Sequence, residues 1–548
     1  MGVPGLQEID GNARVFAGLV ALAARRAAAG RSRSALQWCR TAAGFATTNP
    51  VGVLRSPELE QVVDAVAETL PAQTSGAPGL APAAGRRVLH VLSEAAPIGG
   101  LTRLVERWIQ HDTASASSLV LTRQGEASAR LLSVVEASGG SVIAWPDSID
   151  AVDRAATLRS LGHEVDLVVC HLQSDDAIAC AAFGRGYRGA PVAFANHGDH
   201  IFWMAPSRAQ LIVSNREIAQ DLSIRVRGYA ASSNQVLPLV VPDRHGGVPR
   251  EQVRRSLGVA EDRPLAISVA RAVKFQDTDL SPRFTDLVTA VLEAVPELVF
   301  CAVGPHASDD PWTDLYRRFG DRVIATGPVQ DPQPHFDAAD LYLDTFPFSS
   351  TTSLLEASAS GVAVVSFDGH RGWRRMLGIP TFVGSPADRP DSVGALAARV
   401  AVLARDADAR KDSARAARNV YEGYYDPARW PSLLEQMYAT LGRLRDQGST
   451  IGSSPARGMD EELRDYCAAL WAIEQRTPLL WSVMANRDGL DRRDRREWAV
   501  RCGLSRILAR AGRPLASERI LHPADPSLAR RLGVRVRTRE AEPAGAAS

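Results

Sequence analysis

Short apolar runs alternate with longer segments of helical character, and this alternation occurs twice along the chain. The first cycle has apolar runs at 88–92, 118–122, 141–144, 165–170 and 191–195. The second has them at 265–269, 298–303, 322–326, 341–343 and 362–367. Apolar strands separated by helices are typical of parallel sheets that are buried on both faces. We therefore predict two α/β domains, each built around a parallel sheet.

Proline- and glycine-rich segments divide the chain around these two cycles. A Pro-bounded extended segment at 236–242 marks the crossing from the first domain to the second. The predicted parts are a helical N-terminal extension (1–70), a linker (71–85), an N-terminal Rossmann-like acceptor domain (86–240), a C-terminal Rossmann-like nucleotide-sugar domain (241–445) and a helical, Arg-rich C-terminal extension (446–548).

Composition narrows the functional classes. The 548 residues carry a net charge of +1, which argues against nucleic acid as a partner. The six cysteines are scattered, without the paired spacing of a zinc site, and they fit a reducing compartment. The apolar stretch at 15–24 is too short to span a bilayer, and it precedes its basic residues instead of following them. We expect a cytoplasmic protein and leave peripheral membrane contact open.

The second cycle contains the most specific block, a strand, a polar loop and a short helix between 340 and 361. Ser350, Thr351 and Thr352 stand where the helix begins, and free backbone N–H groups there, together with the helix dipole, form an anion site. Glu356 lies one turn inside the helix, where it could accept hydrogen bonds from a ribose diol. The alternative is a capped helix with an exposed glutamate.

This block resembles the donor-binding segment of GT-B glycosyltransferases, especially the glycosyl transferases group 1 family (family 4). The resemblance covers about residues 86–445 and is strongest between 262 and 370. It implies two Rossmann-like domains that face a central cleft. It also implies that Glu356 holds the nucleotide ribose and that the helix start holds the diphosphate.

The sequence departs from the family at one position. Retaining members carry two glutamates eight positions apart; Glu356 fits the second, whereas Phe348 occupies the position of the first. The loop at 349–352 is also similar to that of inverting protein O-GlcNAc transferases. We expect retention of configuration, and the donor site has more support than the stereochemistry.

Two cations follow the first strand of the second domain. Arg271 and Lys274 lie directly after the run at 265–269, and Lys274 is one of only two lysines in the chain. Cations at the carboxyl end of a parallel strand suit a leaving nucleoside diphosphate. The family uses an Arg and a Lys in this way, although their spacing here is shorter. The alternative is a pair of solvated loop cations.

A DxD sequence follows this loop, at Asp277 and Asp279. Alternating carboxylates are common in turns, and these do not end a central strand. We therefore predict no metal and no cofactor beyond the nucleotide-sugar co-substrate. Arg271, Lys274 and the helix start would replace the cation.

Two further loops receive donor roles from the resemblance. Gly99 and Gly100 follow the first strand and open a helix, and paired glycines let a backbone approach a ligand closely. The family has a glycine-rich loop here, beside the donor phosphates, although an ordinary strand–helix turn explains the pair equally well. Val329 lies in a loop whose backbone meets the base in the family.

The acceptor side is predicted in the first domain. His197 and His200 follow the strand at 191–195, and a histidine at that edge can take a proton from an acceptor hydroxyl. Many family members carry a histidine here, so His197 is the first choice. Asp199 could orient either ring or act as a base; His171 is a weaker candidate. The alternative is a polar turn with a capping histidine.

Taken together, the residues predict a hexose-type transfer from a nucleoside-diphosphate sugar (UDP or GDP) to an acceptor hydroxyl, within bacterial carbohydrate biosynthesis. The acceptor is unknown: a glycan, a lipid-linked glycan, a small molecule or a protein. Two rivals remain. One is a nucleotide-sugar epimerase of the same fold, and the other is a non-catalytic protein that binds sugar nucleotides.

Overall fold

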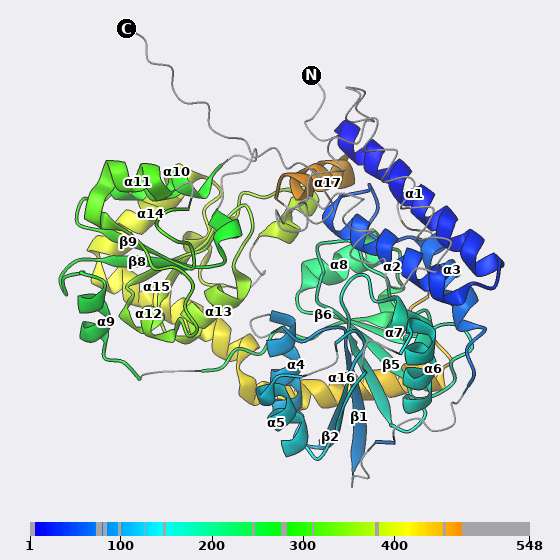
Figure 1. Cartoon of the computed structure of the whole chain (residues 1–548). Helices are drawn as coiled ribbons and strands as arrows, with labels where there is room; N and C mark the ends of the chain where they lie inside the picture. Colours follow the sequence, from blue (N-terminus) through cyan, green and yellow to red (C-terminus); the bar gives the residue numbers. More distant parts are fainter. Residues whose placement is uncertain are drawn as a thin grey trace.

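The computed structural model describes residues 6–72, 79–80, 85–96, 100–124, 127–145, 149–243, 247–275, 282–309, 312–378, 383–452, 456 and 458–473. These residues form two lobes, each around a parallel sheet, with three N-terminal helices against the first lobe (Figure 1). The expected α/β architecture is confirmed. Most of the predicted linker and C-terminal extension lies outside the described residues.

The first sheet has seven strands in the order β3-β2-β1-β4-β5-β6-β7. Every pairing within it is parallel. Its strands are β1 (Arg86–Leu92), β2 (Ser115–Leu121), β3 (Val142–Ala144), β4 (Leu167–His171), β5 (Val192–Asn196), β6 (Leu211–Ser214) and β7 (Asn234–Val236). The first five match the predicted apolar runs to within three residues at either end. Strands β6 and β7, of four and three residues, were not predicted.

The second sheet has five parallel strands in the order β10-β9-β8-β11-β12. They are β8 (Leu265–Val269), β9 (Val299–Val303), β10 (Val323–Ala325), β11 (Leu341–Leu343) and β12 (Ala363–Val365). All five were predicted. Their helices are α9 (Arg250–Ser256), α10 (Phe284–Ala294), α11 (Trp312–Phe319), α12 (Gln333–Ala338), α13 (Thr351–Ala359), α14 (Val393–Arg405) and α15 (Ala407–Val420).

The N-terminal helices are part of the core of the first lobe. They are α1 (Leu6–Ala28), α2 (Ser32–Thr48) and α3 (Pro57–Ala67). Trp38 and Leu36 of α2 are fully or almost fully buried in the same cluster as Leu89 and Val168 of the sheet. Helices α6 (Ala151–Leu161) and α7 (Ala177–Ala182) complete this face. Large apolar side chains thus bind the extension to the first sheet.

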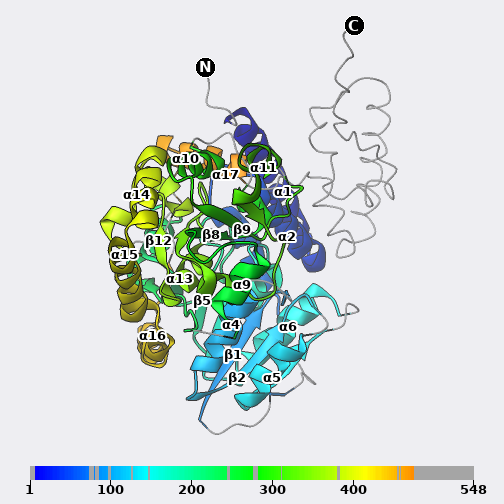
Figure 2. The ribbon, with the colours of Figure 1, turned by 90° about the vertical axis from the view of Figure 1, so that its left-hand side faces the viewer.

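The opposite face of the first sheet is covered by helices from two parts of the chain that are far apart in sequence. They are α4 (Gly100–His111), α5 (Ala129–Ala137) and α16 (Trp430–Asp446). Trp430 and Met437 of α16 pack in one cluster with Leu104 and Leu119. Figures 1 and 2 show α16 leaving the second lobe to lie along the first. The predicted boundary at 445 stays a prediction, but α16 belongs in space to the first lobe.

A separate apolar cluster joins the two lobes. It combines Leu222 of α8 (Glu217–Arg225) with Trp373 and Met376 of the second domain. Helix α17 (Glu461–Ile473) adds Tyr466, which is fully buried. This cluster fixes the second-domain segment after β12 against the first lobe, next to the loop that follows β5.

No helix within the described ranges is long and apolar enough to cross a membrane.

Candidate functional site

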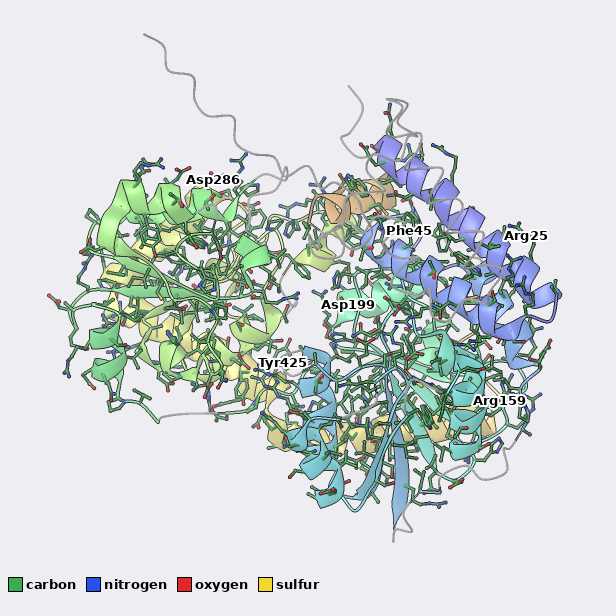
Figure 3. The ribbon with its side chains drawn as sticks, in the orientation of Figure 1. Arg25, Phe45, Arg159, Asp199, Asp286 and Tyr425 are labelled. Carbon is green, nitrogen blue, oxygen red and sulfur yellow. The ribbon has the colours of Figure 1, made fainter. Side chains whose placement is uncertain are left out.

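The candidate residues lie on loops at the carboxyl ends of strands from both sheets. Loop 271–275 follows β8, loop 344–350 follows β11, and loop 197–200 follows β5. Ligands of open α/β sheets bind at this edge. Figure 3 labels Asp199 on the side of the first lobe that faces the second.

The loop before α13 is organised by the buried carboxylate of Asp344. The Ser349 hydroxyl donates to Asp344 Oδ2 at 2.6 Å, and the Ser350 backbone N–H donates to Oδ1 at 2.9 Å. Burial raises the pKa of Asp344 to about 6, against the opposing effect of these hydrogen bonds and of Lys274. The conformation of this loop is therefore fixed by hydrogen bonds between residues that are close in sequence.

Lys274 reaches from the β8 loop into this structure. Its Nζ donates to the Ser349 carbonyl at 2.5 Å and lies 4.4 Å from the centre of the Phe348 ring. The pKa of Lys274 is lowered to about 8. Burial is the main cause, Asp344 opposes the shift, and Arg271 adds to it. Arg271 itself is exposed. The two predicted cations are thus brought to the loop that precedes α13.

Helix α13 begins at Thr351, with Ser350 as its N-cap, and the Ser350 side chain makes no capping hydrogen bond. Asp344 accepts from the backbone N–H of Ser350, the residue before the helix. Ser350 is buried, whereas Thr351 and Thr352 are half-buried. The first backbone N–H groups of a helix point away along the axis, where an anion can accept them. This end of α13 therefore has the geometry of a phosphate site.

Glu356 lies further along α13 and faces the first lobe. Its Oε1 is 3.5 Å from Nη2 of Arg107, which comes from α4. Arg107 also donates from Nη1 to the Val240 carbonyl at 2.8 Å. Both charged side chains are about 15% exposed (14% for Arg107 and 16% for Glu356). Arg107 was not predicted, since a single arginine on an amphipathic helix carries no local signal.

Gly100 and His197 lie together on the first lobe. A Cβ built on Gly100 would stand 3.8 Å from His197 Cε1, so the helix start lies close to the histidine. Burial lowers the pKa of His197, with a smaller opposing effect from Asp199. Gly99 lies outside the described residues.

His171 is the last residue of β4 and is fully buried. Its Nε2 is 3.0 Å from Nδ1 of His90, and the two rings stack. Burial holds the pKa of His171 well below its usual range. A neutral, buried ring paired with another histidine is a core feature, and we keep His171 only as the weaker candidate.

Asp199 forms a buried ion pair with Arg216 and also contacts His200. Arg216 donates from Nε to Asp199 Oδ2 at 2.8 Å and from Nη2 to Oδ1 at 3.1 Å. His200 Nδ1 lies 3.2 Å from Oδ1. Burial alone would raise the pKa of Asp199, but Arg216 and His200 hold it well below its usual range. A carboxylate so fully engaged is suited to orient His200 and is a poor proton acceptor.

Arg216 also bonds to the second domain. Its Nη2 donates to the Met376 carbonyl at 2.8 Å, and its Nη1 donates to the Gly378 carbonyl at 3.2 Å. Tyr466 of α17 donates to the His200 carbonyl at 2.7 Å. The acceptor-side loop is therefore held by residues from three parts of the chain. Arg216 and Tyr466 were not predicted.

Phe348 stands between the two halves of the site. Its ring centre is 5.1 Å from that of His200 on one side, and the Lys274 ammonium lies over the same ring. At the position where the family resemblance predicts a glutamate, an apolar ring thus lies between a histidine and a lysine.

The remaining predictions are not tested by these contacts. Val329 is half-buried and packs against the core of the second sheet. Asp277 and Asp279 lie outside the described residues. Within the part of the chain that the structure describes, no three His, Cys, Asp or Glu side chains are grouped as metal ligands.

Comparisons with known proteins bear on the fold and on the enzyme class. Residues 279–406 match the family described as Glycosyl transferases group 1. Among solved structures, Anabaena Alr3699/HepE in complex with UDP has 16% sequence identity and a TM-score of 0.51, covering 65% of this chain and 100% of that chain. Its complex with UDP-glucose has 16% identity and a TM-score of 0.50 over the same shares.

A mutant of the Thermobaculum terrenum O-GlcNAc transferase is similar over 79% of this chain and 85% of that chain, with 16% identity and a TM-score of 0.46. A search of curated proteins finds no match. The fold is that of GT-B glycosyltransferases. The group 1 match and this fold together support a glycosyltransferase.

Proposed function

We propose that the chain transfers a hexose-type sugar from a nucleoside-diphosphate sugar to an acceptor hydroxyl. The observation that carries the proposal is the arrangement of Lys274, the start of α13 and Glu356 along one edge of the second sheet. UDP-sugars are the first donors to test, because a structural neighbour was solved with UDP and with UDP-glucose.

On the donor side, the diphosphate lies at the start of α13 and accepts from its backbone N–H groups and from Ser350, Thr351 and Thr352. Glu356 accepts from the ribose, while the loop of Val329 meets the base. Gly99 and Gly100 approach the phosphates from the first lobe. As the bond between the sugar C1 and the phosphate oxygen breaks, Lys274 and Arg271 stabilise the charge on the leaving diphosphate.

On the acceptor side, His197 takes the hydroxyl proton while the acceptor oxygen bonds to C1. The lowered pKa of His197 keeps its ring neutral and able to accept that proton near neutral pH. His200, with Nδ1 directed to Asp199, is the second choice. Both rings belong to the loop after β5, so the proton leaves on the first-lobe side of the site.

Two finer features belong to the proposal. Transfer needs no metal, because Arg271, Lys274 and the helix start meet the phosphate charge; activity should survive EDTA, and loss restored by Mn²⁺ would contradict this. Transfer proceeds with retention, which rests on the family resemblance at Glu356. The acceptor oxygen then approaches C1 from the same face that the diphosphate leaves, because a single displacement from the opposite face would invert the configuration. NMR of the product anomer tests it, and an inverted product would fit the apolar Phe348 better.

We further propose a cytoplasmic place in bacterial carbohydrate biosynthesis. The five cysteines in the described part of the chain are free and buried, which fits a reducing compartment. The acceptor class stays open among glycans, lipid-linked glycans, small molecules and proteins, and so does peripheral contact with a membrane.

The deciding experiment is a screen for release of nucleotide from UDP-, GDP- and ADP-sugars. The wild type should release nucleotide slowly by donor hydrolysis, and Glu356→Ala should abolish the release. Binding without any release would favour the non-catalytic alternative. An altered sugar formed without an acceptor would favour the epimerase.

A further inference from the structure

Arg107 joins the first lobe, the crossing segment and the predicted ribose-binding glutamate. It projects from α4, reaches Glu356 of α13 with Nη2 at 3.5 Å, and reaches the Val240 carbonyl with Nη1 at 2.8 Å. Glu356 thus receives an ion-pair contact from the other domain. None of the predicted donor roles includes Arg107.

Helix α4 relates this contact to the rest of the site. It begins at Gly100, which lies against His197. Arg107 is about 10 Å further along the axis, at roughly 1.5 Å per residue. On the same scale, Glu356 is about 7.5 Å from the start of α13. Both helices therefore lead from the proposed transfer end of the site to its proposed ribose end.

The pair of Arg107 and Glu356 is suited to orienting the Glu356 carboxylate. A carboxylate can accept about four hydrogen bonds, so Glu356 can keep Arg107 and still accept ribose hydroxyls. The contact of 3.5 Å is long for a hydrogen bond, so it acts mainly through charge. The planar guanidinium presents separate nitrogens to Val240 and Glu356, whereas an ammonium would have to reach both from a single nitrogen.

We infer that Arg107 is a positioning residue for the donor, which holds the Glu356 carboxylate in the orientation that accepts the ribose diol. The donor site of the second lobe is then completed by the first. This inference rests on the proposed function, because it requires Glu356 to bind the ribose. A purely structural strut between the lobes would instead weaken all nucleotides equally when removed.

The test measures preference for the ribose diol by calorimetry. UDP, or GDP where it binds more tightly, is titrated alongside its 2′,3′-dideoxy analogue. The wild type should prefer the diol by about tenfold or more, the value of a hydrogen bond to a charged group. Arg107→Ala should reduce this ratio to about threefold or less, and Arg107→Lys should give an intermediate ratio.

Two variants serve as references. Arg86→Ala removes another arginine–glutamate pair, with Glu435 at 2.7 Å. Arg86 is the first residue of β1, whereas the site lies at the carboxyl ends of the strands, so this variant should leave the ratio unchanged. The double variant Arg107→Ala/Glu356→Gln should show no further loss beyond Glu356→Gln, because both changes act on one contact. Since each ratio is taken within one protein, a general loss of affinity cancels.

The outcomes distinguish a failure of the inference about Arg107 from a failure of the proposed role of Glu356. A wild-type preference that survives in Arg107→Ala, or tighter diol binding by that variant, overturns the inference alone. Additive losses in the double variant overturn it as well. A wild type without any preference, or without binding to either nucleotide, contradicts the proposed role of Glu356 and the inference with it.

Discussion

The loop before α13 and the loop after β5 face each other across the site, but different contacts hold them. In the first, Asp344 bonds to Ser349 and Ser350, five and six residues away in sequence. In the second, Arg216 links Asp199 to carbonyls of the other domain, 160 and 162 residues away. The donor loop is organised within one domain, whereas the acceptor loop depends on how the two lobes meet.

This difference separates two kinds of function. A loop fixed by its own neighbours is preorganised for binding, so nucleotide affinity should depend little on the other lobe except through Arg107 and the glycines at 99 and 100. A loop fixed across the interface couples acceptor chemistry to the docking of the lobes. Changes on the acceptor side should therefore affect stability and turnover together. Each change on the donor side should affect mainly either donor binding or turnover.

The largest expected effect follows from breaking the pair at the acceptor loop. Arg216→Ala leaves the buried Asp199 carboxylate without its partner and removes two bonds between the lobes. We expect a loss of about 3–5 kcal/mol in the apparent free energy of unfolding, measured by urea denaturation.

Arg317→Ala is the matched control, because its pair with Asp314 is exposed on α11 and should contribute well under about 1 kcal/mol. Equal losses in the two variants would contradict the claim that the acceptor loop is held through Arg216.

The next effect concerns turnover at the donor loop. Lys274→Ala should lower kcat by about a hundredfold or more while donor affinity changes less, because charge on the diphosphate grows in the transition state. Lys274→Arg tests the geometry at Ser349 and Phe348: we expect poor rescue, since the planar fork is bulkier and differently directed. A kcat near that of the wild type in Lys274→Ala would remove the residue from the chemistry.

His197→Ala should lower transfer by roughly a hundredfold, the range of general acid–base catalysis, while UDP or GDP affinity stays nearly intact. His200→Ala is the comparison, because the structure gives His200 a carboxylate partner and places its ring on Phe348. Wild-type transfer by His197→Ala together with a large loss in His200→Ala would move the proton acceptor to His200.

Activity should depend on pH through the donor loop. Lys274 stabilises the leaving group only as an ammonium, so kcat should fall about tenfold per pH unit above its pKa of about 8. Asp344 is ionised above its pKa of about 6, so kcat should also fall as the pH drops below that value. A steady-state pH profile checks both limbs, and an alkaline limb unchanged in Lys274→Arg would contradict the assignment.

The same comparison explains how much the sequence could predict. The second sheet and the block from Asp344 to Glu356 were recognisable, because strand, hydroxyl cluster and helix follow one another along the chain. Arg107 and Arg216 were not, because their partners are 249 and about 160 residues away. Nothing in the local sequence of α16 indicates that Trp430 and Met437 cover the first sheet, since that sheet is more than 190 residues away along the chain.

The central claim is that α13 binds a nucleoside diphosphate through Glu356, and calorimetric titration of UDP and GDP into the wild type and Glu356→Gln tests it most directly. The substitution keeps the size of the side chain and removes its charge, and a charge-assisted hydrogen bond contributes about 1.5–3 kcal/mol. The account predicts that the nucleotide bound by the wild type binds Glu356→Gln about tenfold or more weakly. Equal affinity of the two proteins would contradict it.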